Sequence, residues 1–159
     1  MSQPIHEIRV ALHARTLDIA ALGNTREINL AKTLVQQARM LLGKALGLLG
    51  EATPYPKADD AQSREIAPRA DVADYKPNLP GEAIAAIKTV RAALQVELDA
   101  LARHRRELWA RDYGAEAEFV YRRAYTDLLL AKMWLGEGLA KLAEKKPAAA
   151  EAPVQPPAA

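Results

Sequence analysis

The stretch TREINLAKTLVQQARMLLGKALGLLGE, residues 25–51, returns in a diluted form as AYTDLLLAKMWLGEGLAKLAE, residues 124–144. When the first segment is shifted by 93 positions, nine of 21 residues coincide. Both segments have the apolar spacing of a helix. A helix that occurs twice in one chain predicts two similar structural units. The coinciding positions are Ala31/Ala124, Thr33/Thr126, Ala38/Ala131, Met40/Met133, Leu42/Leu135, Gly43/Gly136, Leu46/Leu139, Leu49/Leu142 and Glu51/Glu144.

The composition of the chain favours a helical protein of one domain. A length of 159 residues is typical of a single domain with a real core, and half of the residues are apolar although only 5% are aromatic. The 22 basic and 20 acidic residues argue against a histone-like wrapper of nucleic acid but leave room for a local basic patch. The absence of cysteine excludes disulfides, cysteine-ligated zinc and thiol nucleophiles.

The sequence predicts a cytoplasmic protein that does not enter the membrane. The first 25 residues carry several charges and have no apolar segment like that of a signal peptide. No stretch approaches the ~20 uninterrupted apolar residues that a membrane-spanning helix needs.

Apolar periodicity and turn residues divide the chain into four expected helices. Gly23 and Asn24 break the first period, and Thr25 is a plausible N-cap for the next helix. An apolar column then recurs every seven residues along the third helix, and Gly114 lies in the turn to the fourth. The expected helices lie near residues 4–21, 25–50, 81–111 and 115–145.

These helices predict an all-α protein made of two helical hairpins. Residues 1–50 form the first hairpin and residues 81–145 the second. Between them, residues 51–80 form a Pro-rich, charged connection that has no sustained period. Residues 146–159 form a Pro/Ala-rich tail that is expected to be disordered. Because each hairpin ends in the same kind of helix, we expect a four-helix arrangement with a pseudo-twofold internal repeat.

The repeated helix also contains a repeated glycine. Glycine inside a helix costs roughly 1 kcal/mol relative to alanine, so Gly43 and Gly136 suggest that another backbone comes close at both places. The apolar residues around these glycines are expected in the core. They are Met40, Leu42, Met133, Trp134 and Leu135.

Three polar residues of the first copy form a candidate phosphate-binding stripe. Arg26 and Thr33 are seven residues apart and therefore share one side of the helix, with Asn29 between them. An arginine fork and a threonine hydroxyl can both donate to phosphate oxygens, and the start of a helix favours anions. The alternative is a surface arginine and a threonine that bonds back to its own helix.

At these residues the sequence resembles a known family. TREINLAKTLVQQARMLLGKAL is similar to the helical-hairpin domain of phage cyclic-oligonucleotide sponges, the anti-CBASS and anti-Thoeris proteins. The second copy fits the apolar half and keeps Thr126, but Phe119 stands where the arginine is expected, and Arg122 follows about one turn later. The positions of the first copy that fit are Arg26, Thr33, Leu34, Gln36, Met40 and Ala45.

The resemblance implies a specific activity. Such proteins are not enzymes; they bind and sequester cyclic di- or trinucleotides, or cyclic ADP-ribose derivatives, that bacteria make to signal infection. They are generally homo-oligomers and act in the cytoplasm of the bacterial host cell. By this resemblance, Arg26 and Thr33 contact phosphate, and no cofactor is needed.

An arginine-rich end provides a second candidate site. Arg122 and Arg123 follow the predicted turn, and Tyr121 and Tyr125 lie one helical turn apart, so that they share a face and could stack on a nucleobase. The alternative is a solvated helix end whose charges pair with each other and whose aromatics close the core. The other members of this end are Arg103, Arg105, Arg106, Trp109, Arg111, Tyr113 and Phe119, with Glu107, Asp112, Glu116 and Glu118 among them.

The remaining patterns carry less functional information. Arg91 and Arg105 lie beside the apolar column of the third helix, so each is expected to be paired or to face a partner chain. His6 and His13 are expected at the surface, because no third metal ligand has suitable spacing. The four expected helices contain no one-turn pair of carboxylates, and no phosphate-binding loop or catalytic triad pattern occurs. A structural or interaction module, such as a virion or adaptor component, is the main alternative function, followed by a DNA-binding protein.

Overall fold

The computed structural model describes residues 3–51, 80–110 and 114–144, which form four α-helices. These are α1 (Gln3–Ala21), α2 (Arg26–Leu48), α5 (Pro80–Trp109) and α6 (Ala115–Glu144). The described residues contain no strand, so the all-α prediction is confirmed, and each helix boundary agrees with its prediction to within about two residues. Most of the predicted 51–80 connection and the predicted 146–159 tail lie outside the described residues.

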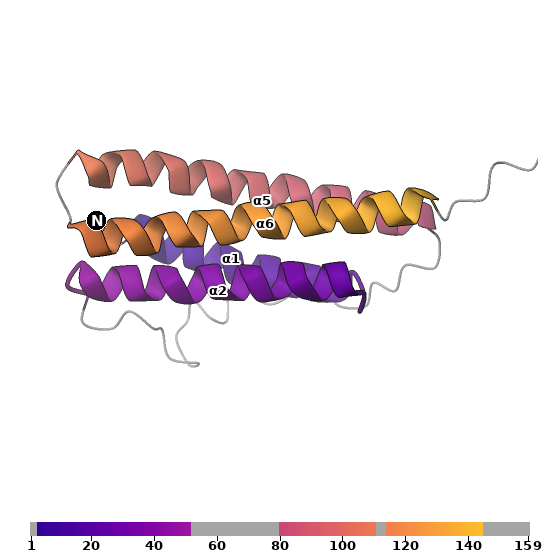
Figure 1. Ribbon diagram of the computed structural model, residues 1–159, viewed down its shortest axis with the longest axis horizontal. Helices are drawn as coiled ribbons and strands as arrows, with labels where there is room; N and C mark the ends of the chain where they lie inside the picture. Colours follow the sequence, from indigo (N-terminus) through magenta and orange to yellow (C-terminus); the bar gives the residue numbers. More distant parts are fainter. Residues whose placement is uncertain (1–2, 52–79, 111–113, 145–159) are drawn as a thin grey trace, which may run out of the picture.

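The four helices form an elongated bundle of two hairpins (Figure 1). Helices α1 and α2 pair as one hairpin, and α5 and α6 pair as the other. The hairpins join through α1 against α5 and, most extensively, through α2 against α6. Each helix is antiparallel to both of its packed neighbours, so that α2 and α5 run in the same direction on opposite corners (Figure 1). The four-helix arrangement is therefore confirmed.

Caps and glycine turns set the limits of the repeated helices. The Oγ1 of Thr25 accepts a hydrogen bond from the Ile28 amide at 3.3 Å, which satisfies one of the free amides at the start of α2. Gly50 (φ 88°) follows the end of α2, and Gly114 (φ 86°) directly precedes α6. A side chain rarely adopts a positive φ, so glycine is the residue that allows these turns.

Alanine lines the interface between the two repeated helices. On α2 and on α6 a buried alanine recurs every seven residues, and the short side chains let the two helices lie close together. Most of the coinciding positions have matching burial: Leu42 and Leu135 are both fully buried, and Thr33 and Thr126 are both exposed. Gly43 is buried whereas Gly136 is only partly buried. The matching positions support the pseudo-twofold repeat. The alanines of this seam are Ala31, Ala38, Ala45, Ala117, Ala124 and Ala131.

The core prediction was wrong for the two methionines. Met40 is 65% exposed and Met133 is 48% exposed. Each lies two residues after a seam alanine, which turns its side chain roughly 200° away from the partner helix. Trp134 is partly buried and packs against the core.

The glycine of the second copy accommodates a side chain and not another backbone. A Cβ placed on Gly136 would lie 3.5 Å from the guanidinium carbon of Arg91. The expected close approach of two backbones at this position is therefore wrong, because the flexible end of an arginine covers the glycine. Gly43 is buried within α2.

Candidate ligand-binding site

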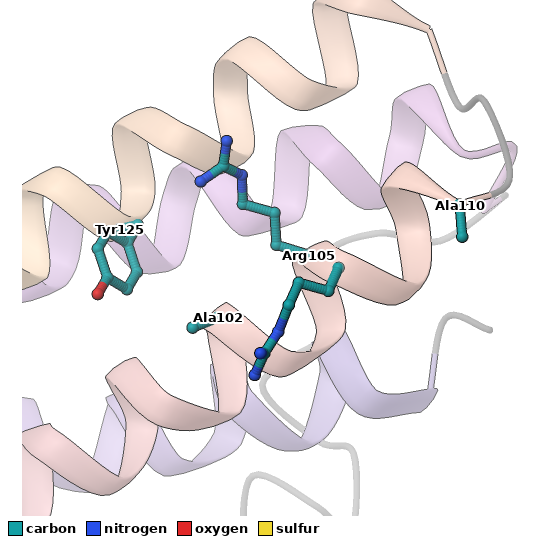
Figure 2. A pocket seen from close by; sticks show the side chains of 5 residues that line it. Ala102, Arg105, Ala110 and Tyr125 are labelled. Carbon is teal, nitrogen blue, oxygen red and sulfur yellow. The ribbon is translucent and has the colours of Figure 1, made fainter.

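A pocket of about 610 Å³ lies between α5 and α6, on the side where Tyr125 faces α5. Figure 2 shows Tyr125 on one wall and residues of α5 on the other. This volume falls within the range of small-molecule sites, which is about 300–1,000 Å³. The residues that line it are Ala102, Arg105, Arg106, Ala110 and Tyr125.

Two arginines give the pocket its positive character. Arg105 donates from Nε and Nη2 to Oε1 of Glu118 on α6, at 2.9 and 2.7 Å, and this ion pair holds the guanidinium across the gap between the helices. Arg106 is exposed, and its side chain forms no ion pair with the described residues. Arg105 is therefore a fixed part of the wall, and Arg106 is the cation that an anionic ligand can engage.

The neighbouring tyrosine does not belong to the pocket. Tyr121 is only 1% exposed, and its hydroxyl lies 3.0 Å from Nδ1 of His104 in the core. Burial raises the pKa of the Tyr121 phenol, and the negative charge of Glu107 raises it further, so the hydroxyl stays neutral. The prediction that Tyr121 shares a ligand-facing surface with Tyr125 is wrong, because Tyr121 is buried against His104 of α5 whereas Tyr125 is only partly buried.

The predicted arginines of α6 lie outside the pocket. Arg122 has a side chain that is 64% exposed and lies 4.0 Å from Glu118. Arg123 lies 3.1 Å from Asp127, whose carboxylate is nearly fully buried. Burial raises the pKa of that carboxyl group, although Arg123 opposes this effect. Both arginines thus have acidic partners within α6, and Thr126 bonds back to the carbonyl of Arg122 at 3.0 Å.

The residues of the Arg26 stripe are exposed on α2, and its polar groups are largely used locally. The Thr33 hydroxyl donates to the Asn29 carbonyl at 2.9 Å, and the Asn29 amide donates to the Asn24 side chain at 2.8 Å. Glu27 already places a carboxylate in the first turn of α2, where an anion would otherwise be favoured. Of the three residues of the stripe, only Arg26 has a side chain that forms no hydrogen bond or ion pair with the described residues. The local arrangement matches the alternative interpretation, in which the threonine bonds to its own helix.

The two candidate sites do not converge. The ion pair between Glu27 and Lys141 places the start of α2 beside the end of α6. Tyr125 lies 16 residues before Lys141, which corresponds to roughly 24 Å along a helix at 1.5 Å per residue. The sequence therefore predicted two separate surfaces, and only Tyr125 of the eight proposed contact residues lines the pocket.

The sequence contains a signal that would have located the pocket. Arg105 and Arg106 belong to the arginine-rich end of the sequence, but the predicted contact residues do not include them. Ala102 lies one turn before Arg106 on the helix that Tyr125 faces, and its small side chain leaves space beside the tyrosine ring. Small residues opposite an aromatic residue mark a hollow only when the helix pairing is known.

The two histidines of α1 are partly buried, whereas the sequence predicted them at the surface. His13, expected at the surface, is half-buried, and its Nδ1 lies 3.0 Å from Nη1 of Arg39. His6 lies 3.8 Å from Glu51. Among the residues that the structure describes, no group of three or more histidine and carboxylate side chains gathers as metal ligands.

None of the four described helices is long and apolar enough to cross a membrane. The chain was compared with protein-family models, with curated proteins and with solved structures, and no match was found.

Proposed function

We propose that this protein binds and sequesters a small anionic ligand of the cyclic di- or trinucleotide class without cleaving it. The observation that carries the proposal is the pocket between α5 and α6, which combines a fixed Arg105, the ring of Tyr125 and Arg106, which forms no ion pair with the described residues. Arginine suits a phosphodiester, and a tyrosine ring suits a base. The resemblance of the repeated helix to phage sponge proteins adds to this support and suggests an anti-defence role in the bacterial cytoplasm.

Binding is tested by calorimetry against a panel of cyclic di- and trinucleotides. Replacing Arg106 with glutamine removes a charge-assisted hydrogen bond, which is worth about 1.5–3 kcal/mol. We therefore expect roughly tenfold to hundredfold weaker binding for Arg106→Gln. Tyr125→Ala should weaken binding as well, because a stacked base loses its platform.

Two control variants separate the candidate surfaces. Arg103→Gln removes an exposed arginine of the same helix that does not line the pocket. It should bind as the wild type does. Arg26→Ala tests the stripe on α2 directly. If Arg26→Ala lost affinity while Arg106→Gln did not, the site would lie on α2, and wild-type protein that bound no member of the panel would contradict the proposal.

Sequestration requires, in addition to binding, that the ligand stays chemically intact. A ligand that has been bound for hours and then released by heat denaturation should be recovered intact by chromatography. A nucleotide that is shortened or opened after release would show that the protein is an enzyme.

The proposal includes self-association, since the resemblance implies a homo-oligomer. Several large apolar side chains of α6 are exposed, among them Phe119 at 70% and Met133 at 48%. We expect at least a dimer at micromolar concentration, and we expect Phe119→Ser to weaken it, because burial of this ring would be lost. Light scattering checks both; a wild-type mass of 17.3 kDa across the accessible range would contradict the expectation.

The same exposed side chains favour a second candidate function. A helical structural or interaction module would use the outer surface of α2 and α6 to hold another protein and would need no nucleotide. In that case Phe119→Ser would abolish the interaction, whereas the nucleotide panel would show no binding to any variant.

A further inference from the structure

A compact group of basic side chains lies between α1 and α2, on the opposite hairpin from the pocket. Arg9, on α1, is 5% exposed, and its Nε donates to the backbone carbonyl of Arg39 at 3.3 Å. One turn later on α1, His13 lies with its Nδ1 3.0 Å from Nη1 of Arg39. Because an arginine always donates, this ring nitrogen accepts, and the histidine proton resides on Nε2. Two arginines and a neutral histidine thus meet at one place.

Arg39 has no acidic partner at this place. Its side chain forms no ion pair with the described residues, and its neighbour His13 is itself a base. Burial lowers the pKa of the Arg39 guanidinium, and both burial and the Arg39 charge lower the pKa of His13. A charged side chain that is partly removed from water gains from a partner of opposite charge. Glu51, which lies near the same hairpin, faces His6.

The repeat places a cation at the equivalent position of the second hairpin as well. The position equivalent to Arg39, 93 residues later, is Lys132, which reaches across to Gln95 on α5. The second hairpin therefore satisfies its cation with a neutral acceptor from the partner helix. In the first hairpin the equivalent cation also donates to a neutral acceptor of the partner helix, Nδ1 of His13, and the other nitrogen of that ring is a second donor.

We propose that Arg39 and His13, beside the point where Arg9 donates to the Arg39 backbone carbonyl, form a binding site for a small oxyanion, a phosphate or a phosphoryl group. The guanidinium of Arg39 supplies planar donors that suit oxyanion oxygens. The His13 ring supplies a second donor through Nε2–H. Arg39 and His13 are both partly exposed, so a small ion can reach them from solvent. The site does not depend on the nucleotide pocket of α5 and α6.

The test is a titration of the full-length protein with inorganic phosphate, followed through the imidazole nitrogen and carbon-bound proton signals of His13. Saturable shifts of these signals are expected in the wild type. A parallel titration with phenyl phosphate shows whether the site accepts a phosphoryl group that is attached to a larger molecule. Arg39→Gln should abolish the saturable shifts, and Arg39→Lys, which keeps one charge without the planar fork, should bind with intermediate strength.

Control variants make the result specific. Lys132→Gln changes the equivalent position of the other hairpin and should leave the His13 titration unchanged, as should Arg106→Gln in the nucleotide pocket. Circular dichroism of each variant checks that it folds. If Arg39→Gln does not fold, Arg39→Lys replaces it in the test. His13 signals that do not respond to phosphate in the wild type, or that respond equally in the Arg39 variants, would overturn the proposal.

Discussion

Two glutamates of this protein show how the environment of a single residue decides its effect on stability. Glu27 lies in the first turn of α2 and accepts a hydrogen bond from Lys141. This hydrogen bond lowers the pKa of Glu27 below its ordinary value. Glu97, on α5, is partly buried, and burial raises the pKa of its carboxyl group although Arg15 opposes the effect. The same side chain is therefore stabilised as an anion at one place and disfavoured as an anion at the other.

The two glutamates should respond to pH with opposite signs. The folded protein holds the Glu97 proton more tightly than the unfolded chain does, so this residue lowers the free energy of unfolding as pH rises from about 4.5 through its raised pKa. Glu97→Gln should therefore be more stable than the wild type at pH 7, and the difference should narrow in acid. For Glu27 the stabilisation is present above pH 4.5 and is lost as pH falls through the lowered pKa. Glu27→Gln should be less stable at pH 7, and its deficit should narrow in acid.

Urea unfolding of both variants across this pH range provides the check. Because the two substitutions are chemically identical, each is the control for the other. If both variants differed from the wild type in unfolding free energy with the same sign at pH 7, the environments of the two glutamates would not differ as described.

At the level of the helix, the seam between α2 and α6 consists of buried alanines, whereas Gly136 beside it has room for a Cβ. Ala131 is fully buried in the seam. Gly136 has Arg91 at 3.5 Å from an added Cβ, which is an ordinary contact distance with a flexible side chain. We expect Gly136→Ala to be neutral or to stabilise the protein by up to about 1 kcal/mol through helix propensity. Ala131→Leu should cost about 1–3 kcal/mol, because the seam has no room for three more carbons.

Denaturant unfolding distinguishes these substitutions, and Thr126→Ala is a useful reference because its position is exposed on the same helix. If Gly136→Ala lowered the free energy of unfolding as much as Ala131→Leu does, the glycine would be needed for close packing.

The helices were predictable because their signals are local. Apolar periodicity located all four, and Thr25 and Gly114 set their limits. The repeat further predicted that α2 and α6 are equivalent. The exposure of Met40 and Met133 was not predicted, because composition identifies them as apolar while only the pairing of helices decides which side is covered. The pocket was missed for the same reason: Ala102 and Tyr125 are 23 positions apart and meet only once α5 and α6 are placed side by side.

At the scale of the whole molecule, the core is shared by the two hairpins. Fully buried side chains come from all four helices, among them Leu12, Leu42, Leu94 and Leu128. The most extensive helix contact, α2 against α6, joins one hairpin to the other. A hairpin on its own would expose the apolar side of both of its helices to water, and helices owe most of their stability to such packing. Neither hairpin is therefore expected to be stable alone.

This shared core leads to a prediction about a divided chain. The fragments 1–51 and 80–159 should each show weak helical circular dichroism and unfold without a cooperative transition. When mixed, they should gain helicity and form a one-to-one complex, because the seam alanines and the core leucines of both fragments become buried together. The complex should be less stable than the intact chain, since association must overcome the loss of translational freedom. Ala131→Leu in the second fragment should weaken the complex, whereas Arg103→Gln should not. Full helicity and cooperative unfolding of either fragment alone would mean that each hairpin is an independent domain and that the α2–α6 seam does not hold the fold together.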